Sequence, residues 1–335
     1  MNLNCIVFPA PRPFYFGEGD FRQDGSLIFV PIDKRNYNST FEMSKNTPEV
    51  HPESVVEELK ERDKKTFPCF YIPYELEEGS SKIIIYLHGN AEDLCGCGEM
   101  MRRLSVAFKC HVIGVEYPGY GVCYQQKVSS KEILQRSMRL YEFLTKEFGY
   151  DDKDIIIFGR SLGTGAAIQT AAANKPGLLV LMSAYTKIKK VAKDICCCSP
   201  CLVKERFRSI NFIKKLNCPF YLIHGRNDKV IKPHHSEDLY ARAIKCGKEE
   251  LCGITIRAEM DHNNFSFTID ISEPIKEFMK EMKISTEVNQ DDPEELRLCK
   301  LKDFKDLGKT PPEYEEEALK DKYLEKRSKS CCIIF

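Results

Sequence analysis

The chain has 335 residues, 42% of them hydrophobic, and its 50 basic and 50 acidic side chains cancel to a formal net charge of zero. This length is sufficient for one large domain with a substantial core. Because the chain has no net charge to attract polyanions, we expect no nucleic-acid partner, and an anionic surface would have to be bound by a local patch. The apolar runs are far shorter than the roughly 18–20 residues that cross a bilayer, so no transmembrane helix is predicted.

Sixteen cysteines and the first residues of the chain bear on its compartment. The N-terminal stretch has no basic region before an apolar one, and Pro9 interrupts it, so no secretory signal is predicted. The cysteines are therefore expected to be thiols, metal ligands or modification sites in a reducing compartment rather than a disulfide framework.

Eight short runs rich in β-branched and aromatic residues predict strands, and helical periodicity separates most of them. The predicted strands are 26–32, 67–74, 82–88, 111–117, 154–159, 178–183, 219–224 and 252–258. From the third strand onward, strands and helices alternate. This alternation predicts an α/β protein with an eight-stranded, mostly parallel sheet and helices on both faces, because parallel neighbours need crossover helices.

Three polar segments interrupt this pattern. Residues 36–65 are interpreted as a surface insertion, and residues 186–217 as a small cap insertion between the sixth and seventh strands. After residue 284 the apolar periodicity ends. The sequence thus predicts one domain over residues 1–284 and a charged, largely disordered tail over residues 285–335, which offers too little apolar surface to offset the entropy of ordering.

The fifth predicted strand leads into a G-x-S-x-G motif, in which Gly159 and Gly163 flank Ser161. A helix of small residues follows. Flanking glycines allow a turn sharp enough to expose the serine hydroxyl at the edge of the sheet, as a nucleophile elbow requires. The alternative interpretation is an ordinary glycine-rich turn between a strand and a helix.

A nucleophilic serine needs a histidine base and a carboxylate that orients it, and with this motif they follow in the order Ser, Asp, His. Asp228 comes after the seventh predicted strand and His262 after the eighth. We therefore predict a triad of Ser161, Asp228 and His262. The carboxylates of Glu259 and Asp261 are rivals, but they would have to fold back onto a histidine that is close in sequence.

The oxyanion formed by nucleophilic attack needs preorganised N–H donors. The first predicted donor is the backbone N–H of Leu162, which follows the nucleophile. The second is the N–H of Asn90, in the loop after the third strand. His88 is interpreted as a packed side chain that orients this loop.

The segments IIIYLHGNAEDL, VEYPGYGV, IIIFGRSLGTG, YLIHGRNDKVI and AEMDHNNF, in this order, resemble the α/β-hydrolase fold. They are most similar to the group of α/β-hydrolase domain-containing proteins numbered seventeen, which act as depalmitoylases, over residues 82–283. The resemblance implies hydrolysis of fatty-acyl thioesters on membrane-bound proteins, with Ser161, Asp228 and His262 at the triad positions. Two features depart from the group: only Cys5 lies within the first sixty residues, where the group has a cysteine cluster, and the long tail has no counterpart.

The last four residues, Cys332 to Phe335, form a C-a-a-X box, for which a terminal Phe predicts geranylgeranylation of Cys332. One lipid chain gives only marginal membrane binding, so a second signal is expected. Cys331 is a candidate for palmitoylation, and a small basic patch lies nearby. The alternative is a plain apolar terminus.

The cap insertion is basic and rich in cysteine. Seven basic and two acidic residues between Lys187 and Arg208 give this stretch a net charge of +5, and four cysteines lie within residues 196–201. Three interpretations stay open: a face that contacts anionic lipid and is S-acylated, a zinc site built on Cys198 and Cys201 with help from Cys95 or Cys97, or simple reduced thiols. His234 and His235, which open the helix after the seventh strand, are expected to be solvated.

These observations together favour a membrane-anchored serine hydrolase that removes acyl chains from S-acylated membrane proteins. The expected partners are those proteins and the lipid surface itself, at the cytoplasmic face of the plasma membrane or of endosomes. We expect no cofactor and no metal. A lysophospholipase or monoacylglycerol-type esterase is the alternative within enzymes, and a catalytically inert membrane-tethered scaffold is the alternative outside them.

Overall fold

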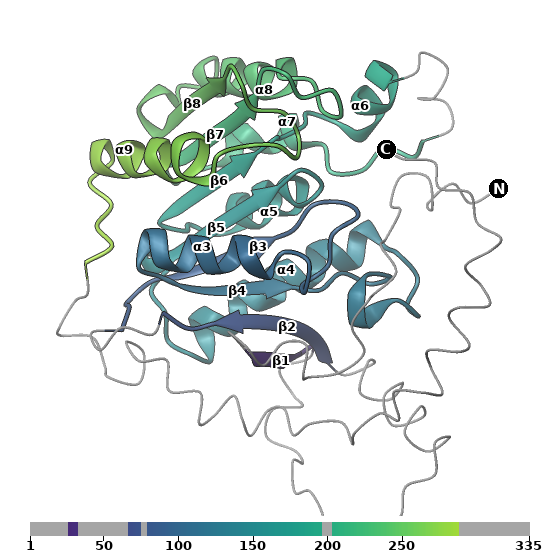
Figure 1. The fold of residues 1–335 in the computed structure, drawn as a ribbon, viewed down its shortest axis with the longest axis vertical. Helices are drawn as coiled ribbons and strands as arrows, with labels where there is room; N and C mark the ends of the chain where they lie inside the picture. The colour runs from purple at the N-terminus through teal and green to yellow at the C-terminus, as the bar shows by residue number, and fades with distance from the viewer. Residues whose placement is uncertain (1–25, 33–65, 75–78, 196–202, 288–335) are drawn as a thin grey trace, which may run out of the picture.

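The computed structural model describes residues 26–32, 66–74, 79–195 and 203–287 (Figure 1). Its strands are β1 (Ser26–Pro31), β2 (Thr66–Ile72), β3 (Ile83–Leu87), β4 (His111–Val115), β5 (Ile155–Arg160), β6 (Leu178–Met182), β7 (Phe220–Gly225) and β8 (Cys252–Arg257). All eight predicted strands are confirmed to within two residues at each end.

The strands form one eight-stranded sheet in the order β1-β2-β4-β3-β5-β6-β7-β8. The pairs β1 with β2 and β2 with β4 are antiparallel, whereas every pair from β4 to β8 is parallel. The predicted mostly parallel sheet is therefore confirmed. Because the parallel strands run the same way, their carboxyl ends meet at one edge, where ligand sites of such sheets lie.

The helices are α3 (Gly98–Phe108), α4 (Ser130–Lys146), α5 (Gly163–Ala173), α6 (Ile188–Ile195), α7 (Ser209–Phe212), α8 (His234–Ile244) and α9 (Glu273–Glu281). Short 3₁₀ turns are η3 (Gly121–Cys123), η4 (Asp152–Asp154), η6 (Ile213–Lys215) and η7 (Glu249–Leu251), and η8 (Phe267–Ser272) is π-helical. Ser129 caps α4, because its hydroxyl accepts a hydrogen bond from the N–H of Glu132.

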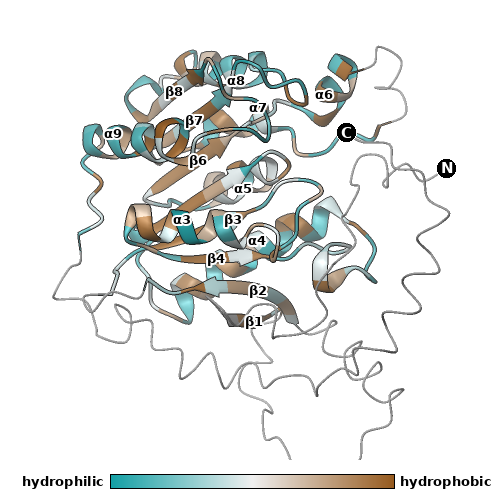
Figure 2. Cartoon of the chain, in the orientation of Figure 1, coloured by the Kyte–Doolittle hydropathy of each residue, from teal (hydrophilic) through white to brown (hydrophobic). Residues whose placement is uncertain are grey.

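Two apolar cores lie on the two faces of the sheet. In β3, Ile83, Ile85 and Leu87 face the core shared with α4, α5 and α8, whereas Ile84 and Tyr86 face the core shared with α3 and α9. This alternation follows from the two-residue period of a strand. Figure 1 shows α3 and α9 on the near face, and Figure 2 shows apolar strands beneath helices with hydrophilic outer sides. Helices on both faces are thus confirmed.

The predicted insertions are only partly described. Residues 36–65 lie outside the described residues, as do 196–202 within the cap insertion and all but three residues of the predicted tail. The described parts of the cap insertion contain α6, α7 and η6. Within the four described ranges, no helix combines the length and hydropathy needed to cross a membrane.

Candidate active site

Ser161 stands on the turn between β5 and α5 with a left-handed backbone, φ 49°. Such a φ is uncommon for a residue with a side chain and marks a strained turn. Neighbouring groups hold it: the N–H of Ser161 donates to the carbonyl of Met182 at 2.9 Å, and the hydroxyl of Thr164 donates to the carbonyl of Ser161 at 2.6 Å. The turn therefore presents the serine hydroxyl at the carboxyl edge of the sheet.

The two glycines of the motif permit this turn for steric reasons. A Cβ on Gly159 would lie 2.7 Å from the Cβ of Ala167, and a Cβ on Gly163 would lie 2.1 Å from the carbonyl oxygen of Leu87. Only glycine therefore lets α5 pack against β5 and the end of β3. The same close packing brings the start of α5 beside the loop that follows β3.

The structure brings Ser161, His262 and Asp228 together, although they lie on three separate loops. The Ser161 Oγ is 3.1 Å from Nε2 of His262, and Nδ1 of the same imidazole is 2.7 Å from Oδ2 of Asp228. These three side chains meet because each follows one of the strands β5, β7 and β8, which are parallel and end at the same edge of the sheet. This arrangement has the geometry that a serine nucleophile, a base and an orienting carboxylate require.

The Asp228 carboxylate is almost fully buried but is surrounded by donors. Its Oδ1 accepts the N–H groups of Val230 and Ile231 at 2.9 and 2.8 Å. Burial by itself would raise the pKa of Asp228, but hydrogen bonds from His224 and His262 outweigh burial and hold that pKa below its usual range. The carboxylate is therefore ionised and can stabilise a positive charge on His262.

His224, which was not predicted as a site residue, is a second histidine beside this carboxylate. Its Nε2 lies 2.7 Å from the carbonyl of Ile231 and 3.3 Å from Oδ2 of Asp228, while its Nδ1 is 2.7 Å from the hydroxyl of Ser236. A carbonyl can only accept, so Nε2 carries a hydrogen, and the Nδ1 contact links the imidazole to Ser236. The fully buried imidazole thus connects α8 to the Asp228 carboxylate.

The predicted oxyanion donors lie on two segments that pack together. Leu162 precedes α5, and the first N–H groups of a helix have no partner within it. The side-chain oxygen of Asn90 accepts the hydroxyl of Tyr120 at 2.6 Å, which holds the loop after β3. Ala91 in this loop has φ 56°. The backbone N–H groups of Leu162 and Asn90 thus lie on adjoining segments, because Gly163 packs against Leu87.

The His88 side chain lies beneath this loop, as the packed role requires. It is fully buried, its ring is stacked on Tyr117 at 3.8 Å, and its two nitrogens lie 2.9 Å from the carbonyl of Gly89 and 3.3 Å from the Glu116 carboxylate. Burial opposes a charge here, but hydrogen bonding and attraction to Glu116 prevail and raise the pKa of His88. Both ring nitrogens face acceptors, which favours the imidazolium form.

Arg160, the variable residue before the nucleophile, links the loops around the site. Its guanidinium pairs with Glu92, and it donates to the carbonyl of His262 at 2.9 Å and to the side chain of Asn263 at 2.8 Å. The other oxygen of Glu92 accepts the N–H of Gly89 at 2.7 Å. Arg160 therefore links the loop after β3, which carries Asn90, to the loop after β8, which carries His262. The sequence offered no signal for this role beyond the position next to Ser161.

The rival carboxylates do not contact the imidazole. Asp261 turns toward its own loop, where Oδ1 accepts the N–H groups of Asn263 and Asn264 at 2.8 and 2.7 Å. These hydrogen bonds lower the pKa of Asp261. Glu259 is exposed on the same loop. The carboxylate within hydrogen-bond distance of His262 is that of Asp228.

One expectation about the histidines was wrong. His234 is partly exposed, but His235 is fully buried rather than solvated. The helix start folds against the cap insertion, which the sequence pattern around residue 234 could not show. Burial, with the neighbouring His234 next in importance, lowers the pKa of His235 to about 4.

Half of the 16 cysteines lie in the described ranges and the other half lie outside them. Eight cysteines of the described ranges are free thiols, and Cys97 is buried with its Sγ donating to the carbonyl of Leu94. The predicted sites at Cys198 and Cys201 in the cap insertion, and at Cys331 and Cys332 in the tail, lie outside the described residues.

Similar proteins add independent information. No family model matches the chain. Residues of the chain are 31% identical over 163 residues to the α/β-hydrolase domain-containing protein aho-3 of Caenorhabditis elegans, a match that covers 48% of this chain and 47% of that protein. α/β-Hydrolase domain-containing protein 17B of Homo sapiens is 28% identical over 159 residues, covering 48% of this chain and 54% of that protein. The matched segments span 47% to 60% of the length of the first curated relatives.

Solved structures agree on the architecture. The esterase Pf2001 of Pyrococcus furiosus has a TM-score of 0.56 and 14% identity, covering 82% of this chain and 96% of that one. A likeness at this identity concerns the fold alone. The chain therefore has the α/β-hydrolase fold, and in sequence it is similar to the α/β-hydrolase domain-containing proteins numbered seventeen, as its motifs predicted.

Proposed function

We propose that the chain is a serine hydrolase whose nucleophile is Ser161. The observation that carries this proposal is the continuous contact from Ser161 Oγ through His262 to Asp228, at 3.1 and 2.7 Å, on a turn with φ 49°. The site combines three features: a strained turn at the serine, a base within hydrogen-bond reach, and a buried ionised carboxylate behind the base. A purely structural role would not require this combination.

The site residues have distinct tasks in the first half of the reaction. Nε2 of His262 takes the proton of the Ser161 hydroxyl as the oxygen attacks the acyl carbonyl, and Asp228 stabilises the imidazolium that forms. The N–H groups of Leu162 and Asn90 receive the negative charge on the carbonyl oxygen. His262 returns its proton to the leaving group, and an acyl-serine ester stays on the enzyme.

The second half reverses these roles. His262 takes a proton from water, the resulting hydroxide attacks the acyl-serine, and the proton returns to the Ser161 oxygen as the carboxylic acid departs. Arg160 does not touch the reacting atoms in this scheme. It holds the His262 loop and, through Glu92, the loop that carries Asn90 in one arrangement for both halves.

The proposed substrate is a long-chain acyl thioester on a cysteine of a membrane protein. The resemblance to the depalmitoylase group and the similarity to human protein 17B support this choice. The chemistry suits it, because a thiolate with a reference pKa near 8.5 leaves with little help from His262 as an acid. The esterase neighbour shares the fold, so an oxygen ester is the competing substrate class.

The proposed location is the cytoplasmic face of the plasma membrane or of endosomes. A prenyl group on Cys332, a palmitoyl group on Cys331 and the basic residues beside them would supply the two signals that stable anchoring needs. This location would place the active site beside its acylated substrates.

Labelling with a fluorophosphonate probe tests the nucleophile. We expect the wild-type chain to be labelled and Ser161→Ala to be unlabelled, while Ser183→Ala, a second buried serine with a positive φ, keeps the label. Absence of labelling in the wild type would leave the inert membrane-tethered scaffold as the better account.

Competition then tests the substrate class. The chain is first incubated with a palmitoylated cysteine peptide or with a monoacylglycerol of the same acyl length, and the probe that labels Ser161 is then added. The thioester is expected to protect Ser161 at a lower concentration than the glycerol ester. Better protection by the glycerol ester would establish an esterase and contradict the thioesterase proposal.

A further inference from the structure

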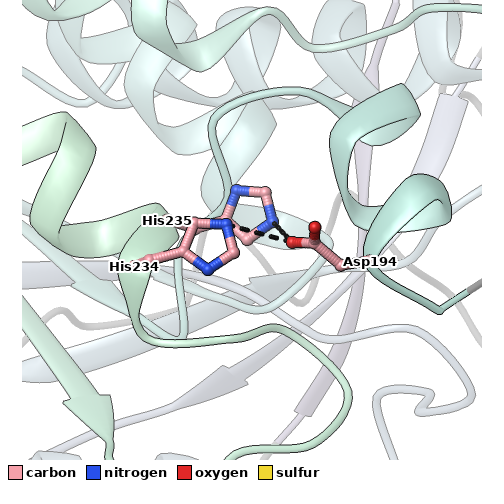
Figure 3. Close-up of side chains that lie close together, drawn as sticks. All are labelled: Asp194, His234 and His235. Atoms are coloured by element: carbon pink, nitrogen blue, oxygen red, sulfur yellow. Dashed lines mark ion pairs between the residues drawn. The ribbon is translucent and has the colours of Figure 1, made fainter.

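Three possible metal ligands meet where the cap insertion touches the body of the fold. Asp194 belongs to α6, in the cap insertion, and His234 and His235 are the first residues of α8 (Figure 3). Nε2 of His234 lies 3.0 Å from Oδ2 of Asp194, and Nε2 of His235 lies 3.1 Å from the same oxygen. Among the described residues, this is the group of histidine, cysteine and acidic side chains that is compact enough to hold an ion.

Burial makes this cluster costly without a partner. His235 is fully buried, and apart from the ion-pair contacts within this cluster neither its Nε2 nor Oδ2 of Asp194 has a hydrogen-bond partner in the described part of the chain. Buried polar atoms are normally satisfied by hydrogen bonds or by a bound ion, because leaving one without a partner is unfavourable. Figure 3 shows both imidazoles aimed at the carboxylate from α8.

The spacing fits a tetrahedral zinc ion. Ligand atoms about 2.0–2.1 Å from zinc in tetrahedral geometry lie about 3.3 Å apart, close to the two nitrogen–oxygen distances observed. Two imidazoles and one carboxylate form a donor set that zinc uses with a fourth position open to water. Asp194 and His234 are partly exposed, so an ion can enter.

A supporting contact orients the buried imidazole. The hydroxyl oxygen of Thr186 lies 2.9 Å from Nδ1 of His235 and can accept its hydrogen, which leaves Nε2 free to bind a metal.

We propose that Asp194, His234 and His235 form a zinc site that fastens α6 of the cap insertion to α8. The site is separate from Ser161 and does not depend on the proposed hydrolase activity. The site is nevertheless connected to the triad, because Ser236, the next residue of α8, contacts His224, and His224 contacts Asp228. An ion here would hold the cap helix at one position relative to the body.

The competing arrangement needs no metal. The N–H of Thr186 also lies 3.3 Å from Nδ1 of His235, and if Nδ1 accepts it, Nε2 carries the hydrogen and points at Asp194. Nε2 of His235 has a lone pair for the ion only when Nδ1 carries the hydrogen, so only that arrangement binds zinc.

Zinc stoichiometry on the purified full chain distinguishes them. The chain is stripped with a chelator, loaded with Zn²⁺, freed of excess metal by gel filtration and analysed for zinc per chain. The comparison is between wild type, Asp194→Asn, His234→Ala and His235→Ala, with Asp238→Asn as the matched control on α8. Every variant keeps all 16 cysteines, so zinc bound by thiols contributes equally to each.

We expect wild type and Asp238→Asn to hold one more zinc ion per chain than the three ligand variants. His234→Ala removes a partly exposed side chain, so it tests the site without opening the core, and circular dichroism checks that each variant is folded. Loading with Co²⁺ should give visible absorption bands in wild type that His234→Ala lacks. Equal zinc content in all variants, or none in wild type, would overturn the proposal. Ser161→Ala should bind zinc like wild type.

Discussion

Arg160 has a positioning task that can be separated from catalysis. We predict that Arg160→Met, which keeps the length of the side chain and removes its charge, lowers kcat for hydrolysis of an acyl ester or thioester substrate by about 10²-fold with a smaller change in KM. The reason is that Glu92 loses its buried partner and the His262 carbonyl loses its donor, so both loops shift. Steady-state kinetics measures the split between kcat and KM.

The control for this prediction is Arg103→Met, which breaks an exposed pair with Glu99 on α3. Exposed pairs contribute little to stability, so this variant should behave like wild type. If Arg160→Met retained full kcat while remaining folded, the positioning role of Arg160 would be wrong.

In the proposed mechanism Asp228 orients the base, so its replacement should affect turnover more than folding. We predict that Asp228→Asn lowers kcat by about 10⁴-fold, because the amide favours the wrong tautomer of His262 and cannot stabilise the imidazolium. Asp261→Asn, on the neighbouring loop, is the control and should keep nearly full turnover, since its carboxylate contacts only its own loop. Similar losses in both variants would contradict the assignment of Asp228.

The lowered pKa of Asp228 also sets the direction of a pH effect on stability. Because the pKa is lower in the folded chain than the usual value of about 3.9, the contribution of Asp228 is present above that value and is lost as pH falls through the folded pKa. Urea unfolding between pH 7 and pH 2 should show a difference between wild type and Asp228→Asn that is constant above about pH 5 and shrinks in acid. A difference that grows in acid would contradict this sign.

At the scale of elements, the contact between α5 and β3 positions both proposed oxyanion donors. We predict that Gly163→Ala lowers the free energy of unfolding by about 3 kcal/mol, because its Cβ would meet the carbonyl oxygens of Leu87 and His88. Hydrolysis should fall as well, since the shift separates Leu162 from Asn90. Chemical denaturation and kinetics on the same samples measure the two effects.

Gly247→Ala separates this steric effect from backbone strain. Gly247 has φ 68°, but no heavy atom lies within 4 Å of the Cβ it would gain. Its replacement should cost about 1 kcal/mol from the left-handed backbone alone and leave hydrolysis unchanged. Equal effects of Gly163→Ala and Gly247→Ala would show that close packing of α5 is not required.

At the scale of the whole molecule, a zero net charge conceals a basic stretch of net charge +5 between Lys187 and Arg208 in the cap insertion. We predict that Cys332→Ser moves the chain from the membrane to the supernatant fraction of lysed cells, because the thiol that prenylation needs is lost. Cys246→Ser, at the end of α8, is the control and should stay with the membrane. If Cys332→Ser still sediments fully with membranes, the terminal lipid is not the anchor.

The sequence by itself determined the sheet and the order of the residues around the candidate site. Alternating apolar runs and helical segments predicted all eight strands, because strand and helix periods are local properties. The G-x-S-x-G motif placed Ser161 at the end of β5, and the order Ser, Asp, His placed Asp228 and His262 after β7 and β8. These inferences needed only neighbours in sequence and the rule that parallel strands end at one edge.

The tertiary structure alone decided the contacts between distant segments. Arg160 meets the His262 carbonyl 102 residues away, and His235 meets Thr186 49 residues away. The buried state of His235 also depends on where α6 of the cap insertion packs, which no local pattern around α8 encodes. Such contacts depend on how whole elements pack, because a side chain is buried or paired only by what the rest of the fold brings against it.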